Sequence, residues 1–441
     1  KNSINNYCYP ENPEAGIDLF LEKLVQETEK EHEDILEQAD ETDAMFGELY
    51  SWYLRNPEYR SRVQKLVQSA FAGKPEDIIS QSVAKALYGE VSPYSATRLE
   101  RFAACAFAHF LQYGMKLTER VEYEFKPMDM GNVMHEALES FAEEVRKRGM
   151  KWTELTEQER NEIADRCLDN IVADYGNTVL KSSARNEYMI ERTRRILRRT
   201  VWALQKQLEQ GEFQPEGFEV TFGGGRIDRV DIMEDQNKVY VKVIDYKTGN
   251  TSFDLVYLYH GLQLQLMIYL DGALRVEQKK YPDKEIIPAG VFYYNIKDPM
   301  IQEKIDADVE AVSAGLMKEL KMNGLVQADP ELVYRMDSSL GSIPVAFNKD
   351  GSFRKNSSVA DRTQFAVLGR YVRTKIEKIR SSILEGDAEV SPYELGKKNA
   401  CTYCPYMTVC GFDRRLSGYE FRRLKNFSDE ELWKAFDREA E

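Results

Sequence analysis

The sequence predicts an α/β protein in which a β-sheet forms the core and large helical segments surround it. Two observations support this fold class. Apolar and polar residues alternate in two short stretches, 218–222 and 239–243, as they do in strands that bury one face. Long charged segments on both sides of these stretches repeat their apolar residues at helical spacing. The 441 residues are enough for two or three domains.

Composition narrows the class of protein further. Apolar residues make up 42% of the chain, within the usual range for globular proteins. The net charge is −14, so bulk charge does not favour nucleic-acid binding and any contact with DNA needs a local basic patch. No apolar stretch is long enough to span a membrane, and the start lacks both Met and a signal sequence. We therefore expect no membrane association and a chain cut from within a longer protein.

The expected elements divide the chain into two domains. Residues 1–90 are expected to be helical, as the remnant of a preceding domain. Residues 91–441 are expected to form one domain, with a helical part at 91–215, a sheet core at 216–300, and C-terminal helices with a cysteine-rich segment at 301–441. Ser95 is the expected N-cap of the first helix of this domain, and Gly131 is expected to open the second. Further elements are expected as a helical region at 152–210, a strand at 289–295, a helix at 300–322, a short strand near 343–347 and a long helix at about 360–384.

Four of the six cysteines have the spacing of a metal site. Cys401, Cys404 and Cys410 crowd together near the C-terminus, and Cys105 lies far upstream. Six cysteines are too few for a disulfide scaffold in a chain of this length, so the pattern indicates metal binding in a reducing cytoplasm. Spacing alone leaves zinc and an iron–sulfur cluster open. Three other candidates are not expected to be ligands: Cys8 and Cys167, which lack this spacing, and His109, which four thiols make unnecessary.

A second polar set lies between these cysteines. Asp228 and Asp245 are expected at adjacent strand ends of one hairpin, and Lys247 projects from the same strand face as Asp245 because side chains alternate along a strand. Two carboxylates suit Mg²⁺ with open positions for a phosphate. A lysine beside them can hold the attacking water and stabilise charge on the phosphate. Asp-x-Lys alone is a weak motif, but the whole set indicates a metal-dependent nuclease.

Side chains from two expected helices can complete that site. His135 can add an imidazole ligand, and Gln265 and Tyr269 share one helix face at i, i+4 spacing. A single histidine near a helix start is usually a cap or a packed core residue. His135 counts as a ligand candidate because it completes a set with Gly131 and the two carboxylates.

Four short motifs occur in a fixed order along the chain: Gly131-x-x-x-His135, Gly225-x-x-Asp228, Asp245-Tyr246-Lys247 and Gln265-x-x-x-Tyr269. This order resembles the RecB-type nuclease family, which uses the PD-(D/E)XK fold. The flanking segments 95–114, 225–231 and 401–413 are similar to those of the AddB family, the B subunits of bacterial AddAB helicase–nucleases. The resemblance runs from about residue 90 to the end. It implies a restriction-endonuclease-like core, with a central mixed sheet flanked by helices.

The resemblance also implies a role for each candidate residue. His135, Asp228 and Asp245 would bind Mg²⁺ together with the backbone carbonyl of Tyr246, and Lys247 would be the catalytic lysine. Gln265 and Tyr269 would orient the site or the DNA. The cysteine ligands would hold a [4Fe–4S] cluster that staples the two ends of the nuclease domain, a structural rather than a redox role. These ligands are Cys105, Cys401, Cys404 and Cys410.

The activity implied by the resemblance is that of an exonuclease in DNA repair. It would cut single-stranded DNA at unwound double-strand breaks, in a heterodimer with an AddA-like helicase–nuclease subunit. Two alternatives stay open: a stand-alone iron–sulfur exonuclease, and a catalytically silent DNA-binding module whose cluster only stabilises the fold. No Gly-x-x-x-x-Gly-Lys-Ser/Thr motif occurs, so we expect no ATP hydrolysis by this chain itself.

One helical segment offers a candidate surface for DNA. Residues 185–199 contain six arginines, of which Arg192, Arg195 and Arg199 fall on one face of a helix. A solvated helix surface and a phosphate-binding face both fit this pattern, and the nuclease motifs elsewhere in this acidic chain favour the second as much as the first.

Overall fold

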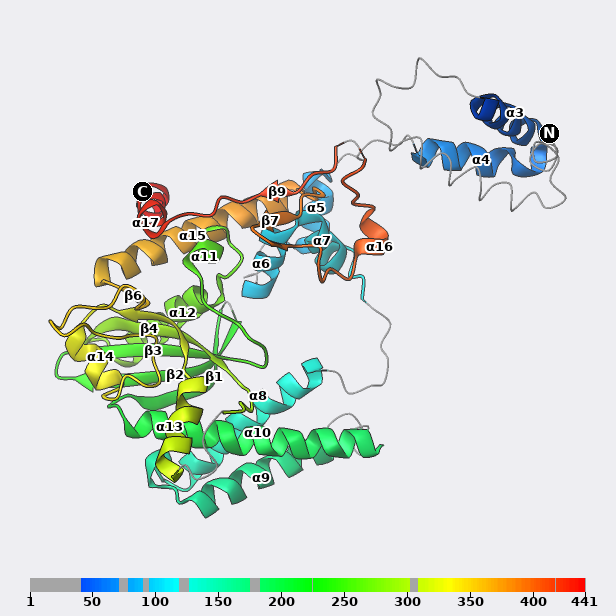
Figure 1. Cartoon of the computed structure of the whole chain (residues 1–441). Helices are drawn as coiled ribbons and strands as arrows, with labels where there is room; N and C mark the ends of the chain where they lie inside the picture. The colour runs from blue at the N-terminus through cyan, green and yellow to red at the C-terminus, as the bar shows by residue number, and fades with distance from the viewer. Residues whose placement is uncertain are drawn as a thin grey trace.

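A mixed six-stranded β-sheet forms the centre of the computed structural model (Figure 1). The structure describes residues 41–70, 78–89, 95–118, 127–174, 183–223, 225–301, 308–416 and 418–440. The strands lie in chain order across the sheet. Strands β1 to β3 form an antiparallel meander, β4 runs parallel to β3, β5 is antiparallel to β4, and β6 is parallel to β5. Their bounds are β1 (Gln214–Phe222), β2 (Gly225–Asp235), β3 (Lys238–Lys247), β4 (Glu285–Asn295), β5 (Asn323–Gln327) and β6 (Val359–Ala360).

Long helices cover one face of the sheet and share a core with it (Figure 1). Apolar side chains such as Phe141 and Leu204 from these helices meet Tyr240 and Ile244 from β3. Two shorter helices follow strands β4 and β5. The elements of this layer are α8 (Pro127–Lys147), the single turn η2 (Trp152–Glu154), α9 (Glu157–Asp174), α10 (Ala184–Glu209), α13 (Val309–Glu319) and α14 (Pro330–Met336).

A second helical layer covers the opposite face. Val239, Val241 and Val243 of β3 belong to its core, so β3 alternates between the two layers with the period of two expected of a strand. This layer consists of α5 (Gln81–Tyr88), α6 (Ala96–Ala104), α11 (Leu255–Tyr259), α12 (Gln265–Lys280), α15 (Arg362–Glu385) and α17 (Asp429–Ala440). The α/β class with a mixed sheet flanked by helices is thereby confirmed.

The cysteine-rich segment folds as a small appendage beside this second layer. It holds a three-stranded sheet of β7 (Tyr393–Leu395), β8 (Lys398–Asn399) and β9 (Arg422–Arg423), with the helical turn α16 (Met407–Cys410). The helix α7 (Ala106–His109) and the π-helical turn η1 (Phe110–Gly114) continue the chain directly from α6. Segments from the two ends of the nuclease-like region therefore meet here.

Helices α3 (Glu41–Arg55) and α4 (Pro57–Ala70) pack on each other around Leu49, Tyr53 and Val63. They form a core of their own, apart from the sheet in Figure 1. Helix α5, in contrast, places Ala84 and Tyr88 in the core of the second layer. The expected domain boundary near residue 90 stays a prediction, and residues 1–40 of the expected helical region lie outside the described residues. No helix among the described residues is long and apolar enough to cross a membrane.

Several expected elements occur with changed limits. Ser95 is the N-cap of α6, where its side chain accepts a hydrogen bond from the backbone N–H of Arg98. The helix expected at 360–384 is α15, and that at 300–322 is the shorter α13, with residues 302–307 outside the described chain. The helical region at 152–210 contains α9 and α10, which are separate helices. The sheet also extends beyond the expected core at 216–300, because β5 and β6 come from later residues.

Two local predictions are wrong. Gly131 does not open its helix, because α8 begins at Pro127, where a missing N–H costs nothing. A Cβ at 131 would make ordinary contact with the side chain of Thr248, just after β3, so helix α8 passes close to the end of that strand. No strand forms at 343–347, since Pro344 lacks an N–H and the Val345 N–H instead bonds the carbonyl of Ile343 in a tight turn.

Candidate active site

The two aspartates of the candidate site lie on neighbouring strands of one hairpin. Arg229 of β2 pairs with Ile244 of β3, so Asp228 and Asp245 are the next residue on each strand. The backbone N–H of Tyr246 donates a 2.7 Å hydrogen bond to Asp228 Oδ2. Both carboxylates are buried, and the Asp245 side chain is only 1% exposed. The hairpin register therefore fixes the two carboxylates side by side at one end of the sheet.

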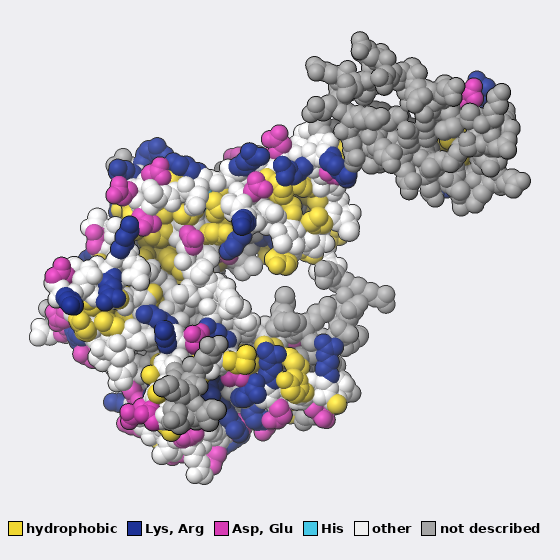
Figure 2. Space-filling view, viewed as in Figure 1, with side chains coloured by type: hydrophobic (Ala, Val, Ile, Leu, Met, Phe, Trp, Pro, Cys, Tyr) yellow, Lys and Arg dark blue, Asp and Glu magenta, His cyan; other side chains and the backbone are white. Residues whose placement is uncertain are grey.

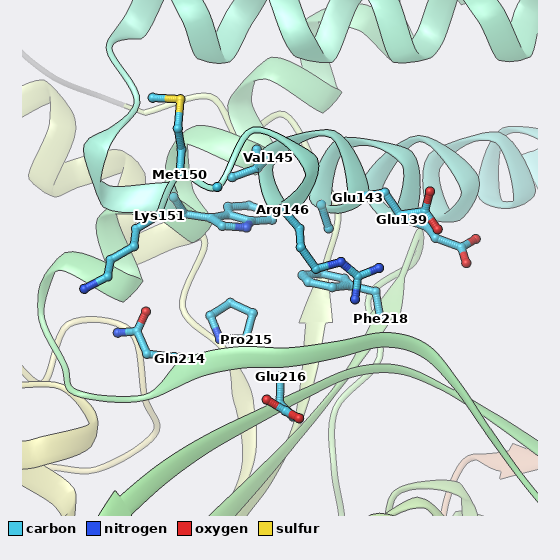
Figure 3. A pocket seen from close by; sticks show the side chains of 13 residues that line it. Glu139, Glu143, Val145, Arg146, Met150, Lys151, Gln214, Pro215, Glu216 and Phe218 are labelled. Atoms are coloured by element: carbon cyan, nitrogen blue, oxygen red, sulfur yellow. The ribbon is translucent and has the colours of Figure 1, made fainter.

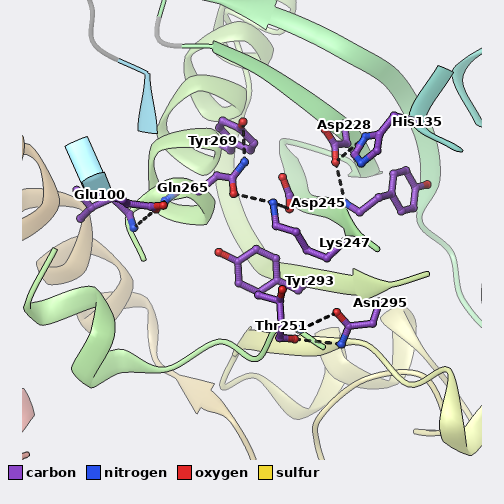
Figure 4. Close-up of polar contacts among 12 residues, drawn as sticks. Glu100, His135, Asp228, Asp245, Lys247, Thr251, Gln265, Tyr269, Tyr293 and Asn295 are labelled. Atoms are coloured by element: carbon purple, nitrogen blue, oxygen red, sulfur yellow. Dashed lines mark hydrogen bonds and ion pairs between the residues drawn. The ribbon is translucent and has the colours of Figure 1, made fainter. Parts of the chain in front are cut away.

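A chain of polar contacts runs from Asp245 to helix α12 (Figure 4). Lys247 Nζ lies 2.5 Å from Asp245 Oδ2 and donates a 2.8 Å hydrogen bond to Gln265 Oε1. Gln265 Nε2 in turn donates to Tyr269 Oη at 2.9 Å. The structure thus brings together the strand pair and the helix pair that the sequence singled out. The ammonium group of Lys247 is held in one orientation, between a carboxylate and an amide oxygen.

Glu100, which sequence reasoning missed, supports this chain from helix α6. Its Oε1 accepts hydrogen bonds from the backbone N–H groups of Leu264 and Gln265, at 2.7 and 2.9 Å, and so holds the first turn of α12. Burial raises the pKa of Glu100 to about 7, against the opposing effects of these hydrogen bonds and of Lys247. The only sign of this role in the sequence was an acidic residue directly after the apolar Leu99.

His135 reaches the hairpin from helix α8. Its Nδ1 lies 3.4 Å from Asp228 Oδ2 and 3.8 Å from Glu219 Oε1. Burial alone would lower the pKa of His135. The two carboxylates form hydrogen bonds with the imidazole and carry negative charge, and together these effects outweigh burial and raise the pKa of His135 to about 10. In the absence of a metal ion, a proton on the imidazole therefore supplies the positive charge between the carboxylates.

Glu219 is a second residue of the site that sequence reasoning missed. It lies on β1 between two pairs of the β1–β2 ladder, Phe218 with Arg229 and Val220 with Ile227, so it faces Asp228. Its side chain is 6% exposed, and its φ of 49° is unusual for a residue other than glycine. The signal in the sequence was the stretch of three glycines at 223–225 between two expected strands, from which a hairpin register can be counted back to Glu219.

The donor set fits a divalent cation. Ligand atoms of His135, Glu219 and Asp228 all lie within 4.8 Å of one another. Burial, followed by the charge of Asp228, raises the pKa of Asp245 to about 7, although Lys247 and His135 act against this. Buried carboxylates that repel one another gain most from a bound cation, and oxygen donors with one imidazole suit Mg²⁺ or Mn²⁺. The residues present therefore match the metal that the fold implies.

Comparison with known protein families agrees with this geometry. Residues 93–411 match the family model described as the PD-(D/E)XK nuclease superfamily, a span that includes the hairpin, helices α6 and α12, and the four grouped cysteines. The chain belongs to the PD-(D/E)XK nuclease superfamily.

Individual relatives are similar over most of the chain. The B subunit of the ATP-dependent helicase/deoxyribonuclease from Lachnoclostridium phytofermentans is 41% identical over 91% of this chain and 36% of its own length. Proteins of the same name from Thermoanaerobacter sp. (strain X514) and Clostridium acetobutylicum are 34% and 33% identical, over 91% and 90% of this chain and 37% and 36% of their lengths. The similarity to the B subunits of helicase–nucleases that the motifs indicated is thereby confirmed. The chain spans a little over a third of the length of these relatives.

The PD-(D/E)XK hairpin is also held from its other face by a buried ionic triad. Arg229 Nε and Lys242 Nζ lie 2.5 and 3.0 Å from the two carboxylate oxygens of Asp231, which is fully buried. Burial would raise the pKa of Asp231, but the two cations outweigh it and lower that pKa. The triad links β2 to β3 on the face opposite Asp228 and Asp245 and so restrains the same hairpin.

The four cysteines predicted to bind a metal converge on one small cavity, which all of them line. Cys105 joins α6 to α7, and the others come from the appendage around α16. Burial, and then the three other thiols, raise the pKa of Cys401 to about 12. The Phe412 N–H points at Cys410 Sγ at 3.5 Å. Because thiolates packed this closely repel one another, the set fits a bound metal centre with four sulfur ligands, as the superfamily resemblance implied.

The remaining cysteine and histidine candidates lie elsewhere. Cys167 is buried in the core between α8 and α9, and Cys8 lies outside the described residues. His109 is buried and accepts a hydrogen bond from Arg98 at its Nε2. Burial lowers the pKa of His109 to about 3, so it is a neutral, packed histidine.

The arginines of α10 are exposed or partly exposed, and most of them contact a partner. Arg195 Nε lies 2.6 Å from Asp298 Oδ2, and the Arg199 guanidinium stacks 5.4 Å from the ring centre of Trp202. Arg192 is exposed. Figure 2 shows basic side chains over the lower helices with acidic ones among them. The structure therefore leaves both interpretations of this surface possible, a solvated helix face and a phosphate-binding face.

A cavity of about 280 Å³ lies beside the site, between the C-terminal half of α8 and the start of β1 (Figure 3). It combines apolar rings with charged groups of both signs. Its lining includes Glu139, Arg146, Lys151, Trp152 and Phe218. None of the predicted metal ligands or catalytic residues lines this cavity, so it is separate from the candidate active site.

Proposed function

We propose that this chain is a Mg²⁺-dependent deoxyribonuclease that cuts single-stranded DNA from unwound double-strand breaks, within a helicase–nuclease complex that includes an AddA-like subunit. The observation that carries the proposal is the convergence of Asp228, Asp245 and Lys247 on one hairpin end, beside His135. The names of the relatives support the complex, since each is a subunit of an ATP-dependent helicase/deoxyribonuclease.

The metal ligands are assigned from this arrangement. His135, Asp228, Asp245 and the backbone carbonyl of Tyr246 would hold Mg²⁺. When bound, the cation supplies a Lewis acid for the phosphate and a water molecule of lowered pKa for the attack.

The protein's own groups orient the reaction. Lys247 presents a fixed ammonium group where negative charge grows on the phosphate, and a preorganised charge of this kind costs no reorganisation during the reaction. Tyr269 accepts a hydrogen bond from Gln265 and so keeps the amide oxygen of Gln265 directed at Lys247. Glu100 holds the first turn of the helix that carries Gln265. Attack by water in line with the leaving oxygen would leave a 5′-phosphate end.

The cysteine set is assigned a [4Fe–4S] cluster with a structural role. Its thiols join the residues just after α6 to the appendage around α16, and α6 also carries Glu100. The cluster would therefore staple two distant parts of the chain next to a helix that reaches the active site.

A cleavage assay on the anaerobically purified chain tests the function. Labelled single-stranded and duplex DNA are incubated with Mg²⁺ or EDTA, and visible absorption is recorded on the same sample. Cleavage of single strands only with Mg²⁺ is the expected result. DNA binding without cleavage would instead favour the catalytically silent module. A cleavage rate that an added AddA-like subunit does not change would favour the stand-alone exonuclease.

Metal affinity is expected to rise with pH. Protons on Asp245, with a pKa of about 7, and on His135, with a pKa of about 10, must leave before these groups can bind a cation. Affinity for Mg²⁺ should therefore tighten by at least about tenfold between pH 6 and pH 8. Titration calorimetry in two buffers of different ionisation enthalpy measures both the affinity and the protons released. An affinity that does not change with pH would contradict these protonation states.

We also propose that Arg192, Arg195 and Arg199 contact the DNA backbone. Asp298, which pairs with Arg195, comes three residues after Asn295, and Asn295 lies beside Lys247 in the β3–β4 ladder. The arginine face of α10 thus approaches the sheet end that carries the catalytic residues, where a strand leaving the site can reach it.

Charge reversal at Arg195 and Arg199 should weaken single-strand binding. Each lost phosphate contact should reduce the slope of log affinity against log salt by about 0.7, as measured by fluorescence anisotropy. Arg362→Glu is a matched control, because Arg362 is also exposed and paired with a carboxylate, Glu285, but at the opposite end of the sheet. Equal affinity and slope in the double variant and this control would assign the arginines of α10 to the solvated surface.

A further inference from the structure

Glu219 occupies a place in the site that none of the recognised motifs covers. It lies on β1, and its carboxylate faces the space that His135 and Asp228 enclose. With its side chain 6% exposed, Glu219 is as well shielded from solvent as Asp228, whose side chain is 11% exposed. A carboxylate buried beside two other carboxylates is costly unless a cation neutralises it.

The two oxygens of Glu219 face different partners. Oε1 is directed to His135, 3.8 Å from its Nδ1. Oε2 pairs with the Nε of Arg226, whose side chain is 64% exposed. The guanidinium group therefore pairs with Oε2, whereas Oε1 is directed at the imidazole.

We propose that Glu219 is a further ligand of the divalent cation, through Oε1, alongside His135, Asp228 and Asp245. The proposal rests on the proposed function, because the cation is the one that the nuclease site would hold. A third carboxylate raises the negative charge of the donor set, and affinity for hard divalent cations increases with that charge. Arg226 pairs with the other oxygen of Glu219, and most of the Arg226 side chain stays exposed to solvent.

Glu139 offers a matched control for charge. It lies on α8 one turn after His135, close enough for the charges of Glu219 and Arg226 to affect it, but it is less buried and belongs to no group of possible ligands among the described residues. Glu139→Gln removes the same charge as Glu219→Gln from the same neighbourhood. Any difference in metal affinity between the two variants then reports the loss of a metal ligand, because the loss of one nearby negative charge is common to both.

The test is Mn²⁺ binding by the metal-free chain, followed by electron paramagnetic resonance of the free ion and by calorimetry. Mn²⁺ takes the same oxygen and imidazole donors as Mg²⁺ and gives a direct signal. Glu219→Gln should weaken the site by about tenfold to a hundredfold, a range typical of losing a group that supports a metal site. Glu139→Gln should change affinity by less than about threefold, and Arg226→Gln should leave it equal or tighter, since it removes a nearby cation.

Each outcome decides the proposal. Equal Mn²⁺ affinity in Glu219→Gln and Glu139→Gln would overturn the role of Glu219 and leave the nuclease proposal standing. Equal weakening in Glu219→Gln and Arg226→Gln would also overturn it, because the effect would then come from the lost ion pair. A parent chain that binds no Mn²⁺ at all would overturn both proposals. Should Glu219→Gln not fold, Glu219→Asp keeps the charge with a shorter reach and should show an intermediate loss of affinity.

Discussion

Replacing Lys247 or Asp245 by alanine should abolish DNA cleavage. Lys247 holds a fixed positive charge 2.5 Å from the buried carboxylate of Asp245, and the proposed function gives both groups a direct role at the phosphate. Loss of a metal ligand or of a preorganised charge in such a site costs at least about 100-fold in rate. Single-turnover cleavage of labelled single-stranded DNA measures the effect.

The fold should survive the change at Asp245. Burial and the charge of Asp228 raise the pKa of Asp245 above its usual value. The protonated carboxyl is therefore the form that suits the metal-free fold, and the ionised carboxylate destabilises that fold as the pH rises. The isosteric Asp245→Asn variant should therefore unfold in EDTA at pH 8 at the same temperature as the parent or higher. Lys284→Ala is the control for Lys247, because Lys284 also pairs with a carboxylate, Glu234, at the opposite end of the sheet. Parental cleavage rates in Lys247→Ala or Asp245→Ala would show that the site assignment is wrong.

Replacing Cys105 or Cys410 by alanine should bleach the iron–sulfur absorption and destabilise the nuclease region. A shared cluster closes a loop of about 300 residues between them, and a cross-link over a loop this long limits the unfolded chain as a disulfide does. The expected loss is about 2–5 kcal/mol in the free energy of unfolding, by analogy with the removal of a disulfide. Denaturant unfolding of anaerobic samples, followed by circular dichroism, gives this value.

Cys167→Ala is the matched control. Cys167 is equally buried, at 5% exposure against 8% for Cys105, but it lies in the apolar core between α8 and α9. Its replacement should cost only about 1 kcal/mol from lost packing and leave the absorption intact. If metal analysis of the anaerobically purified parent found zinc and no iron, the cluster proposal would be wrong. The nuclease proposal would not be affected.

Local spacing rules account for the residues that sequence analysis placed in the site. Asp245 and Lys247 are two apart on a strand, so they share a face whatever surrounds them. Gln265 and Tyr269 are four apart on a helix, so they also share a face. These relations depend only on backbone geometry, and the structure joins the two pairs by the hydrogen bond from Lys247 to Gln265.

Residues that enter the site through packing between distant segments could not be found in this way. Glu219 reaches Asp228 because β1 pairs with β2 in one register, and Glu100 reaches α12 because α6 packs beside it. The pairing of Arg195 with Asp298 likewise joins residues more than a hundred positions apart. Pro344 shows the same limit in reverse, since the apolar stretch around it was expected to form a strand but instead forms a turn, followed by an isolated bridge between Phe347 and Phe353.

The sequence by itself determined the α/β class and the candidate hairpin, because alternation and helical spacing are properties of short stretches of chain. It grouped Cys105 with the other three cysteines through the order of its motifs, since Cys105 lies far upstream of them. Only the tertiary structure decided which further side chains complete the site, which arginines are neutralised by carboxylates, and where α8 begins. Those outcomes depend on which surfaces pack together and on how burial changes the energy of each charge. Neither the partner nor the burial of a residue is contained in the stretch that surrounds it.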